Sequence, residues 1–358
     1  MRKDSIFIIT HNQFGYQTDF YNYCKYLLPY YKIQYICLDQ GKEKLTLQGI
    51  SITYIISSKI NLLTLLHLIF YIIKTIKKNK PTIVLMKYLP LCSLVNISSG
   101  NTKCIMDVRT ASVSRNPLLN FINDTILYCE YRLFKHSIVL SRDIKERLFL
   151  NRATVIPLGA DIIDPSEKNF DNFRLLYVGT LNNRDIEKTI FGLKIFVNKN
   201  PKIDIKYTII GHGNIDACQK IVDAIKINGM DDIIEYRGAI PFNKLYLPFK
   251  QNNIGISFIP MTIYYDKQPP TKTYEYLMSG MPVIATKTTA NMQIINKTSG
   301  MLIDDTPESF AEGLEEIVKN RNNYSSKLIR NMYMENTWKN IVTKKLFPYL
   351  IKINESKT

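Results

Sequence analysis

Residues 267–286, KQPPTKTYEYLMSGMPVIAT, hold the start, the body and the stop of a helix in unbroken order, followed by a short apolar strand. Pro270 suits the first turn of a helix but not its interior. Gly280 supplies a left-handed stop, and Pro282 prevents the helix from resuming. The stretch therefore predicts a helix over about 270–279 and then a buried strand, which is the alternation of an open α/β sheet.

Two polar residues of this helix, Thr271 and Glu275, lie one turn apart on one face. The free N–H groups of a helix N-terminus attract phosphate, and Lys272 adds a positive charge in the first turn. A carboxylate about 6 Å further along the axis can accept the two hydroxyls of a ribose attached to that phosphate. The alternative interpretation is an ordinary amphipathic helix with a solvated Glu275.

The same residues, PPTKTYEYLMSGMPVIAT, resemble the donor-binding signature of family 4 of the GT-B glycosyltransferases, the glycogen-synthase-like group 1 enzymes that use nucleotide sugars. In that family the helix carries the second glutamate of an E-x7-E pattern, and Glu275 falls on it. Lys267 stands where the first glutamate would fall, and Asp266 stands one position further out. The resemblance implies transfer that retains anomeric configuration and needs no metal ion or other cofactor.

The composition is that of a globular chain of two domains, because 358 residues exceed what one hydrophobic core usually organises. The six cysteines are scattered without zinc-ligand spacing or a disulfide framework. The N-terminus reads as a first strand and not as a signal peptide. These features predict a cytoplasmic protein without a metal site.

The net charge of +16 is concentrated in the first 160 residues, where about 21 Lys and Arg face about 9 Asp and Glu. A basic surface implies an anionic partner, such as acidic lipid head groups or a phosphorylated substrate. The sequence contains no zinc-finger, homeodomain, basic-zipper or RNA-recognition pattern. Nucleic acid is therefore not expected as a partner.

The first strand, Ser5–Thr10, is followed by a loop with Gly15 and a helix that begins near Thr18. Ligands of open α/β folds bind at such strand ends. The loop contains no G-x-G-x-x-G, so it does not predict dinucleotide binding. The family resemblance implies that small residues here approach the donor, and Gly15 is the residue that matches.

The most apolar stretch, residues 61–78, is bordered by lysines and is interrupted by Thr64 and His67. It is shorter than the roughly 20 apolar residues needed to span a bilayer. Two interpretations remain open. The stretch is either a buried helix that covers the sheet, or one that also presses an apolar edge and a basic end onto an anionic membrane.

The strand Lys103–Val108 brings Asp107 and Arg109 to its carboxyl end, where α/β enzymes keep their chemistry. The family places a histidine or an aspartate near this strand end, close to the reacting sugar, which implies a catalytic role for Asp107. Alternatively, Asp107 caps local N–H groups of a loop or helix.

A second series of strands and helices begins after VIPLGADI, residues 155–162, which resembles the family's interdomain hinge. The strand over residues 175–178 ends at Gly179, and a helix predicted to begin near Asn183 carries Arg184 and Lys188 at i and i+4. Two cations on one helix face can clamp a diphosphate. The family often has an arginine where Thr180 stands, so the resemblance transfers that role to Arg184, with Lys188 as second choice. On a solvated surface the same two cations would instead pair with neighbouring acids.

Three further glycines, Gly211, Gly213 and Gly238, stand at strand ends where a backbone can approach a ligand. Gly238 lies in a segment that resembles the family's nucleobase-binding segment. The C-terminal stretch starts with Thr337 as a cap and Trp338 in the first turn, and family members often end in a helix that crosses back to the N-terminal domain. A single tryptophan there is expected to be a packing anchor.

The sequence predicts two Rossmann-like domains that face each other across a cleft, with boundaries 1–158, 159–335 and a returning helix over 336–358. The predicted activity is hexosyl transfer from a nucleoside-diphosphate sugar to a glycan or lipid-linked acceptor in cell-surface polysaccharide biosynthesis, by a cytoplasmic enzyme on the inner face of the plasma membrane. The alternatives are a sugar-nucleotide epimerase of the same fold and a noncatalytic glycan- or membrane-binding protein. The predicted catalytic residues are Asp107, Arg184 and Lys188. The predicted donor-binding residues are Gly15, Gly179, Gly211, Gly213, Gly238, Lys267, Thr271, Lys272 and Glu275.

Overall fold

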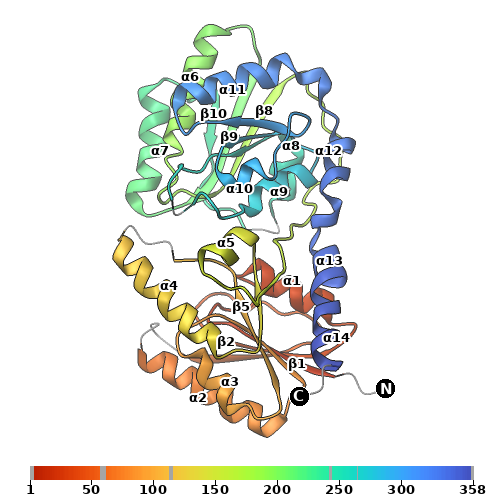
Figure 1. Ribbon diagram of the computed structural model, residues 1–358. Coiled ribbons are helices and arrows are strands. Elements are labelled where there is room, and N and C mark those ends of the chain that lie inside the picture. The colour runs from red at the N-terminus through yellow and green to blue at the C-terminus, as the bar shows by residue number, and fades with distance from the viewer. Residues whose placement is uncertain (1–3, 57–61, 113–115, 242–243, 264, 356–358) are drawn as a thin grey trace. The chain divides into compact units, whose positions relative to one another are not determined.

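The chain forms two compact units, which are described separately (Figure 1). The structure is a computed structural model that describes residues 4–56, 62–112, 116–241, 244–263 and 265–355. Unit 1 comprises Met1–Gly159 and Trp338–Thr358, and unit 2 comprises Ala160–Thr337.

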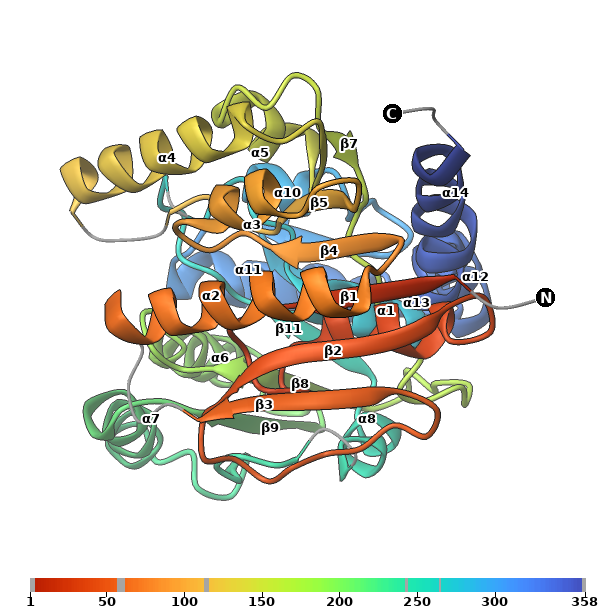
Figure 2. The same ribbon diagram turned by 90° about the horizontal axis from the view of Figure 1, so that it is seen from below.

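Unit 1 contains a parallel sheet in the order β3-β2-β1-β4-β5-β6-β7. Its strands are β1 Ser5–Ile9, β2 Lys32–Asp39, β3 Ser51–Ile56, β4 Ile83–Lys87, β5 Lys103–Val108, β6 His136–Val139 and β7 Thr154–Val155. Figure 2 shows β3, β2, β1 and β4 side by side, with α2 lying over their face.

The helices of unit 1 lie on both faces of this sheet. They are α1 Thr18–Leu27, α2 Leu62–Asn79, α3 Cys92–Ser98, α4 Pro117–Arg132, α5 Arg142–Arg147, α13 Trp338–Ile341, the π-helical turn η4 Val342–Leu346, and α14 Phe347–Glu355. Helix α3 packs against both α2 and α4 on one side, and α1 packs against α13 and η4 on the other (Figures 1 and 2).

Unit 2 repeats this architecture with a parallel sheet in the order β10-β9-β8-β11-β12-β13. Its strands are β8 Phe173–Thr180, β9 Ile205–His212, β10 Ile234–Tyr236, β11 Ile254–Ser257, β12 Val283–Thr286 and β13 Gly300–Ile303. Its helices are α6 Glu187–Lys199, α7 Ile215–Ile227, α8 Tyr246–Gln251, α9 Thr271–Met278, α10 Thr289–Met292, α11 Pro307–Lys319, the short turns η2 Arg321–Asn323 and η3 Met334–Asn336, and α12 Ser326–Tyr333. The predicted α/β class and two Rossmann-like halves are confirmed.

The helix and strand predicted from residues 267–286 are both present, as α9 and β12. Pro270 precedes the helix in an extended conformation, and Gly280 ends it in the left-handed region at φ +73°. All four residues of β12 are buried, as expected for a central strand of a parallel sheet.

The prediction that a helix begins near Asn183 is wrong. Helix α6 begins at Glu187, and Asn183 and Asp185 adopt left-handed conformations with φ of 55° and 49°. Asn and Asp tolerate this region better than other residues with a Cβ. Arg184 therefore lies in an irregular loop between two left-handed residues and shares no helix face with Lys188.

Helix α2 covers the sheet with its buried residues Leu68, Ile69, Ile72 and Ile76. Its outer side keeps large apolar side chains exposed, including that of Phe70. Asn61, the first residue of the predicted stretch, lies outside the described residues. No helix in the described ranges is long and apolar enough to cross a membrane.

The C-terminal segment packs into unit 1 through Trp338, which is fully buried. Its ring lies edge-on to Tyr23, with the ring centroids 6.1 Å apart. A Cβ added at Gly159 would come within 2.6 Å of the Trp338 ring, so a glycine is needed there. Trp338 is therefore a packing anchor, as predicted.

Candidate functional site

A cavity of about 380 Å³ lies at the carboxyl end of the unit 2 sheet. The strand order reverses between β8 and β11, and open α/β folds bind ligands at such a switch point. The cavity is lined by Val178, Gly179, Thr180, Arg184, Leu245, Ile259, Tyr265, Gln268, Pro269, Pro270, Thr271, Lys272 and Glu275.

Helix α9 is fixed against two strands by its buried face. The Thr273 hydroxyl is 2.7 Å from the Ser257 hydroxyl at the end of β11. The backbone N–H of Val178 in β8 donates a 2.8 Å hydrogen bond to the Tyr276 hydroxyl. Because this face is held, the remaining side of the helix presents Thr271, Lys272 and Glu275 to the cavity.

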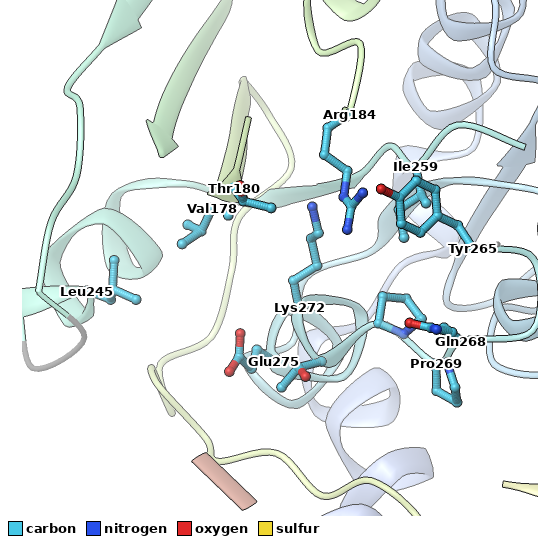
Figure 3. A pocket seen from close by; sticks show the side chains of 13 residues that line it. Val178, Thr180, Arg184, Leu245, Ile259, Tyr265, Gln268, Pro269, Lys272 and Glu275 are labelled. Carbon is cyan, nitrogen blue, oxygen red and sulfur yellow. The ribbon is translucent and has the colours of Figure 1, made fainter. Parts of the chain in front are cut away.

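Two cations, Arg184 and Lys272, line the cavity, and Figure 3 shows the Arg184 side chain beside the Tyr265 ring. The Arg184 guanidinium carbon is 4.0 Å from the centre of the Tyr265 ring, and the Lys272 Nζ is 4.0 Å from the centre of the Tyr177 ring. An aromatic ring attracts a cation electrostatically, and the side of the cation that faces away from the ring stays free to contact an anion. The arrangement therefore brings two basic side chains to one cavity and places each against a ring.

The cavity also shifts the pKa values of its titratable groups. Burial, reinforced by the charge of Arg184, lowers the pKa of Lys272 to about 7. Burial and the nearby Asp161 carboxylate raise the pKa of Glu275 to about 7, against the opposing charge of Lys272. Each group would regain its ordinary charge if a ligand supplied the missing partner, a phosphate for Lys272 and hydroxyl groups for Glu275.

Two lysines of the predicted site, the catalytic candidate Lys188 and the donor-binding candidate Lys267, do not line the cavity. Lys188 approaches Asp185 to 3.5 Å at the start of α6, which is the surface pairing considered as the alternative. Lys267 is exposed and does not line the cavity. The neighbouring Asp266 accepts hydrogen bonds from the Thr289 N–H at 2.8 Å and from its hydroxyl at 2.6 Å. Asp266 therefore binds the first turn of α10 and does not line the cavity.

Of the predicted glycines, Gly179 lines the cavity. A Cβ there would come within 3.2 Å of the Lys272 amine, so glycine leaves room for that cation. Gly211 and Gly213 serve packing behind the cavity, because a Cβ at Gly211 would meet the Gly179 carbonyl oxygen at 2.3 Å. Gly238 turns with φ +65°, and its carbonyl accepts from the Gly211 N–H at 2.8 Å.

In unit 1, Asp107 is fully buried at the end of β5, with its Oδ1 3.8 Å from the Arg109 Nη1. Arg109 donates to Asp19 at 2.6 Å and to the Tyr23 hydroxyl at 3.0 Å. Asp107 accepts no hydrogen bond from a backbone N–H in the described ranges, so it is not a cap. Burial raises the pKa of Asp107 to about 7.

The first βα turn of unit 1 places Gly15 at φ +86°, where a Cβ would come within 2.4 Å of Leu45 Cδ1. Close by, Lys87 at the end of β4 donates to Asn12 Oδ1 at 2.9 Å. Burial lowers the pKa of Lys87, and the neighbouring Asp107 carboxylate opposes that shift. This strand edge therefore gathers a partly desolvated lysine and a buried carboxylate.

Sequence reasoning did not single out Tyr265 and Gln268 of the cavity lining, or Tyr177, which contacts Lys272. Tyr265 and Gln268 line the cavity, and the ring of Tyr177 lies against the Lys272 amine. Tyr265 and Gln268 stand in the loop before α9, where no periodicity assigns a direction to a side chain. Within the described residues, no group of three or more His, Cys, Asp or Glu is placed to hold a metal ion.

Comparison with known proteins agrees with this geometry. Residues 172–320, most of unit 2, match the family of glycosyl transferases group 1. No curated protein sequence matches the chain at a significant level. The fold is similar to that of a glycosyltransferase from Rickettsia africae, at 14% identity and a TM-score of 0.77 over all of both chains.

Two further structures share this fold. A sucrose-phosphate synthase from Thermosynechococcus elongatus aligns over 99% of this chain and 100% of its own, at 14% identity and a TM-score of 0.77. HepE from Anabaena, solved with UDP and glucose, aligns over 97% and 99%, at 13% identity and a TM-score of 0.72. The family match over residues 172–320 confirms the predicted resemblance to group 1 glycosyltransferases and supports an enzyme of the transferase type.

Proposed function

We propose that this group 1 glycosyltransferase moves a sugar from a nucleoside-diphosphate sugar to a glycan or lipid-linked glycan acceptor. The observation that carries the proposal is the unit 2 cavity, which combines two cations, the N-terminus of α9 and one carboxylate. Diphosphate is the leaving group of such a reaction, and its developing negative charge needs stabilisation in the transition state. The sugar is a hexose and its anomeric configuration is retained, as in the enzymes that the sequence resembles.

In this proposal Arg184 and Lys272 neutralise the diphosphate, and the free N–H groups at Thr271 bind one of its oxygens. Glu275 accepts hydrogen bonds from the ribose hydroxyls. Lys272 serves as the second cation, a role that the sequence analysis proposed for Lys188. With two cations at the leaving group, the reaction proceeds without a metal ion.

Asp107 remains the proposed acid of unit 1 near the reacting sugar, supported by its strand-end position and its raised pKa. The enzyme is proposed to work in the cytoplasm on cell-surface polysaccharide synthesis. An epimerase of the same fold would need acids and a histidine around the sugar. The described lining of the unit 2 cavity offers one acid, Glu275, and no histidine, so the geometry favours transfer.

The first experiment is a thermal-shift screen of the full chain against UDP, GDP and ADP, with and without Mg²⁺. Because HepE was solved with UDP and glucose, UDP is the first nucleotide to test. Stabilisation by one nucleotide in the absence of metal is the expected result. Stabilisation that requires Mg²⁺ would contradict the metal-free proposal, and no shift with any nucleotide would favour a noncatalytic binding protein.

Glu275→Ala tests the ribose contact in the same protein. We expect the substitution to weaken nucleotide binding by about 1–3 kcal/mol, because it removes the acceptor of the ribose hydroxyls. Isothermal titration calorimetry measures the change. Glu312→Ala, on the exposed side of α11, is the matched control and should leave the affinity unchanged. Equal affinities of the Glu275→Ala and wild-type proteins would remove the proposed role.

A further inference from the structure

The helix α4 turns an apolar stripe toward solvent. Its exposed large side chains include Phe121, with 70% of its surface exposed, and Leu118, with 66%. The stripe consists of Leu118, Phe121, Ile122, Ile126, Cys129 and, just after the helix, Leu133. A surface helix usually packs such residues against the core, whereas α4 also exposes a row of apolar side chains to solvent.

The stripe continues onto the neighbouring helix α3, where Ile97 is 66% exposed. Helices α3 and α4 are in contact, and a shallow pocket of about 240 Å³ lies between them. Helix α2 lies on the other side of α3 and exposes Phe70 (Figures 1 and 2). We call the exposed apolar residues of these three packed helices the α2–α4 face.

The α2–α4 face presents no outward carboxylate in its three helices. The sequences of α2 and α3 contain no Asp or Glu, and α4 contains two. Asp124 accepts from the Ser112 N–H at 2.9 Å, and Glu130 accepts from the backbone N–H groups of Leu91 and Ser93, each at 2.6 Å. The acids of α4 are thus used inside unit 1.

The charges that do face outward here are positive, and they belong to a strongly cationic unit. Lys74, Lys77 and Lys78 are exposed at the end of α2, and Arg132 is exposed at the end of α4. Unit 1 has 26 Lys and Arg against 10 Asp and Glu, whereas unit 2 has 21 of each. The net charge of +16 therefore resides entirely in unit 1.

From these observations we propose that the α2–α4 face docks onto an anionic lipid bilayer. Apolar side chains enter the boundary between head groups and acyl chains, and the flanking lysines contact the acidic head groups. Helix α4, about 24 Å long by the helical rise, lies in the plane of the membrane. A second copy of the chain is a poor partner for this face, because the contact would bring together two copies of unit 1, each with a net charge of +16.

The inference rests on the proposed function only in giving the membrane a purpose, which is access to a lipid-linked acceptor. The test is co-sedimentation of the full chain with vesicles of phosphatidylcholine, alone or mixed with phosphatidylglycerol. We expect the protein to sediment with the mixed vesicles and to stay in solution with phosphatidylcholine alone. Added salt should weaken the binding without abolishing it.

The double variant Phe121→Ser/Ile122→Ser should bind the mixed vesicles about tenfold more weakly or worse, because two apolar side chains no longer leave water. The matched control is Ile215→Ser/Ile227→Ser, which removes two exposed isoleucines from α7 in the neutral unit and should bind as the wild type does. A thermal melt with UDP checks that the α4 variant is folded and keeps its nucleotide site.

Three results would overturn the proposal. The first is that the wild-type protein stays in solution with both kinds of vesicle, and the second is that the α4 variant binds the mixed vesicles as well as the wild type does. The third is that size-exclusion chromatography shows a dimer of the wild type that the α4 substitutions convert to a monomer, which would make a second copy the occupant. None of these results concerns nucleotide binding, so a failure of the membrane inference is distinguishable from a failure of the proposed function.

Discussion

At the scale of the residue, the unit 2 site is distinguished by Lys272, whose ammonium form is disfavoured because burial and Arg184 lower its pKa to about 7. A bound diphosphate would restore the positive charge, so binding and protonation are linked. The pKa of Glu275 is raised to about 7, so its carboxyl gains the negative charge that suits the proposed contact only as the pH rises. Loss of the Lys272 proton should therefore weaken binding above neutral pH, and protonation of Glu275 should weaken it below neutral pH.

The dissociation constant for UDP should therefore rise with pH above about 7.5, by up to about tenfold per pH unit, as Lys272 loses its proton. Calorimetric titrations at increasing pH measure this slope. Lys272→Arg keeps the charge at every pH and should flatten it. Lys267→Arg, an exposed control outside the cavity lining, should leave it unchanged. An unaltered slope in Lys272→Arg would show that another group titrates.

Arg184 depends on a different support, the ring of Tyr265. Tyr265→Leu should weaken UDP binding by about 0.5–2 kcal/mol, whereas Tyr265→Phe keeps the ring and should bind nearly as the wild type does. Tyr246→Leu is the matched control, because it breaks a surface pair with Lys250 in the same unit.

The role of Tyr265 as a positioning residue is decided in a double-mutant cycle. If Tyr265 acts through Arg184, Tyr265→Leu should have no further effect in an Arg184→Ala background. A full effect in that background would mean that the ring contacts the nucleotide itself.

At the scale of the element, the end of α9 depends on the left-handed Gly280. A Cβ there would also come within 2.7 Å of the Ser326 Cβ in α12. Gly280→Ala should lower the free energy of unfolding by about 1–3 kcal/mol, as measured by urea denaturation. Gly229→Ala shares the positive φ but has open space around it, so it should cost less. Equal costs would show that packing against Ser326 contributes nothing.

The elements that sequence reasoning placed correctly are those bounded by proline or glycine. Prolines and Gly280 bound α9, and the apolar run after them left one interpretation for β12. The start of α6 was misplaced because Asn183 and Asp185 serve equally well as a helix start and as left-handed loop residues. Local sequence does not choose between these uses.

The lining of the unit 2 cavity could be predicted to the same extent. Thr271, Lys272 and Glu275 follow from helical spacing, which fixes the face on which they lie. Tyr265 and Gln268 come from the irregular loop before α9, where backbone turns and not periodicity aim the side chains. The burial of Asp107 was equally out of reach, because Tyr23 and Arg109, which surround it, meet only through tertiary structure.

At the scale of the whole molecule, unit 1 is completed by the C-terminal segment through Trp338. Trp338→Ala should lower the free energy of unfolding of unit 1 by about 3–5 kcal/mol, because it opens a large cavity beside Tyr23 and Gly159. Differential scanning calorimetry measures the loss. The affinity for UDP should not change, since the proposed nucleotide site lies in unit 2. A large loss of affinity would contradict the separation of the two units.

The chain leaves unit 1 after Gly159 and returns to it at Trp338, and the two passages are joined by a bridge between Ala160 and Thr337. During synthesis on the ribosome, unit 2 thus has all of its residues before unit 1 does. Unit 1, whose first part is made before unit 2, must wait for Trp338–Thr358 to emerge. Until then the pocket for Trp338 stays open, so the nascent chain holds a complete neutral unit and an incomplete cationic one.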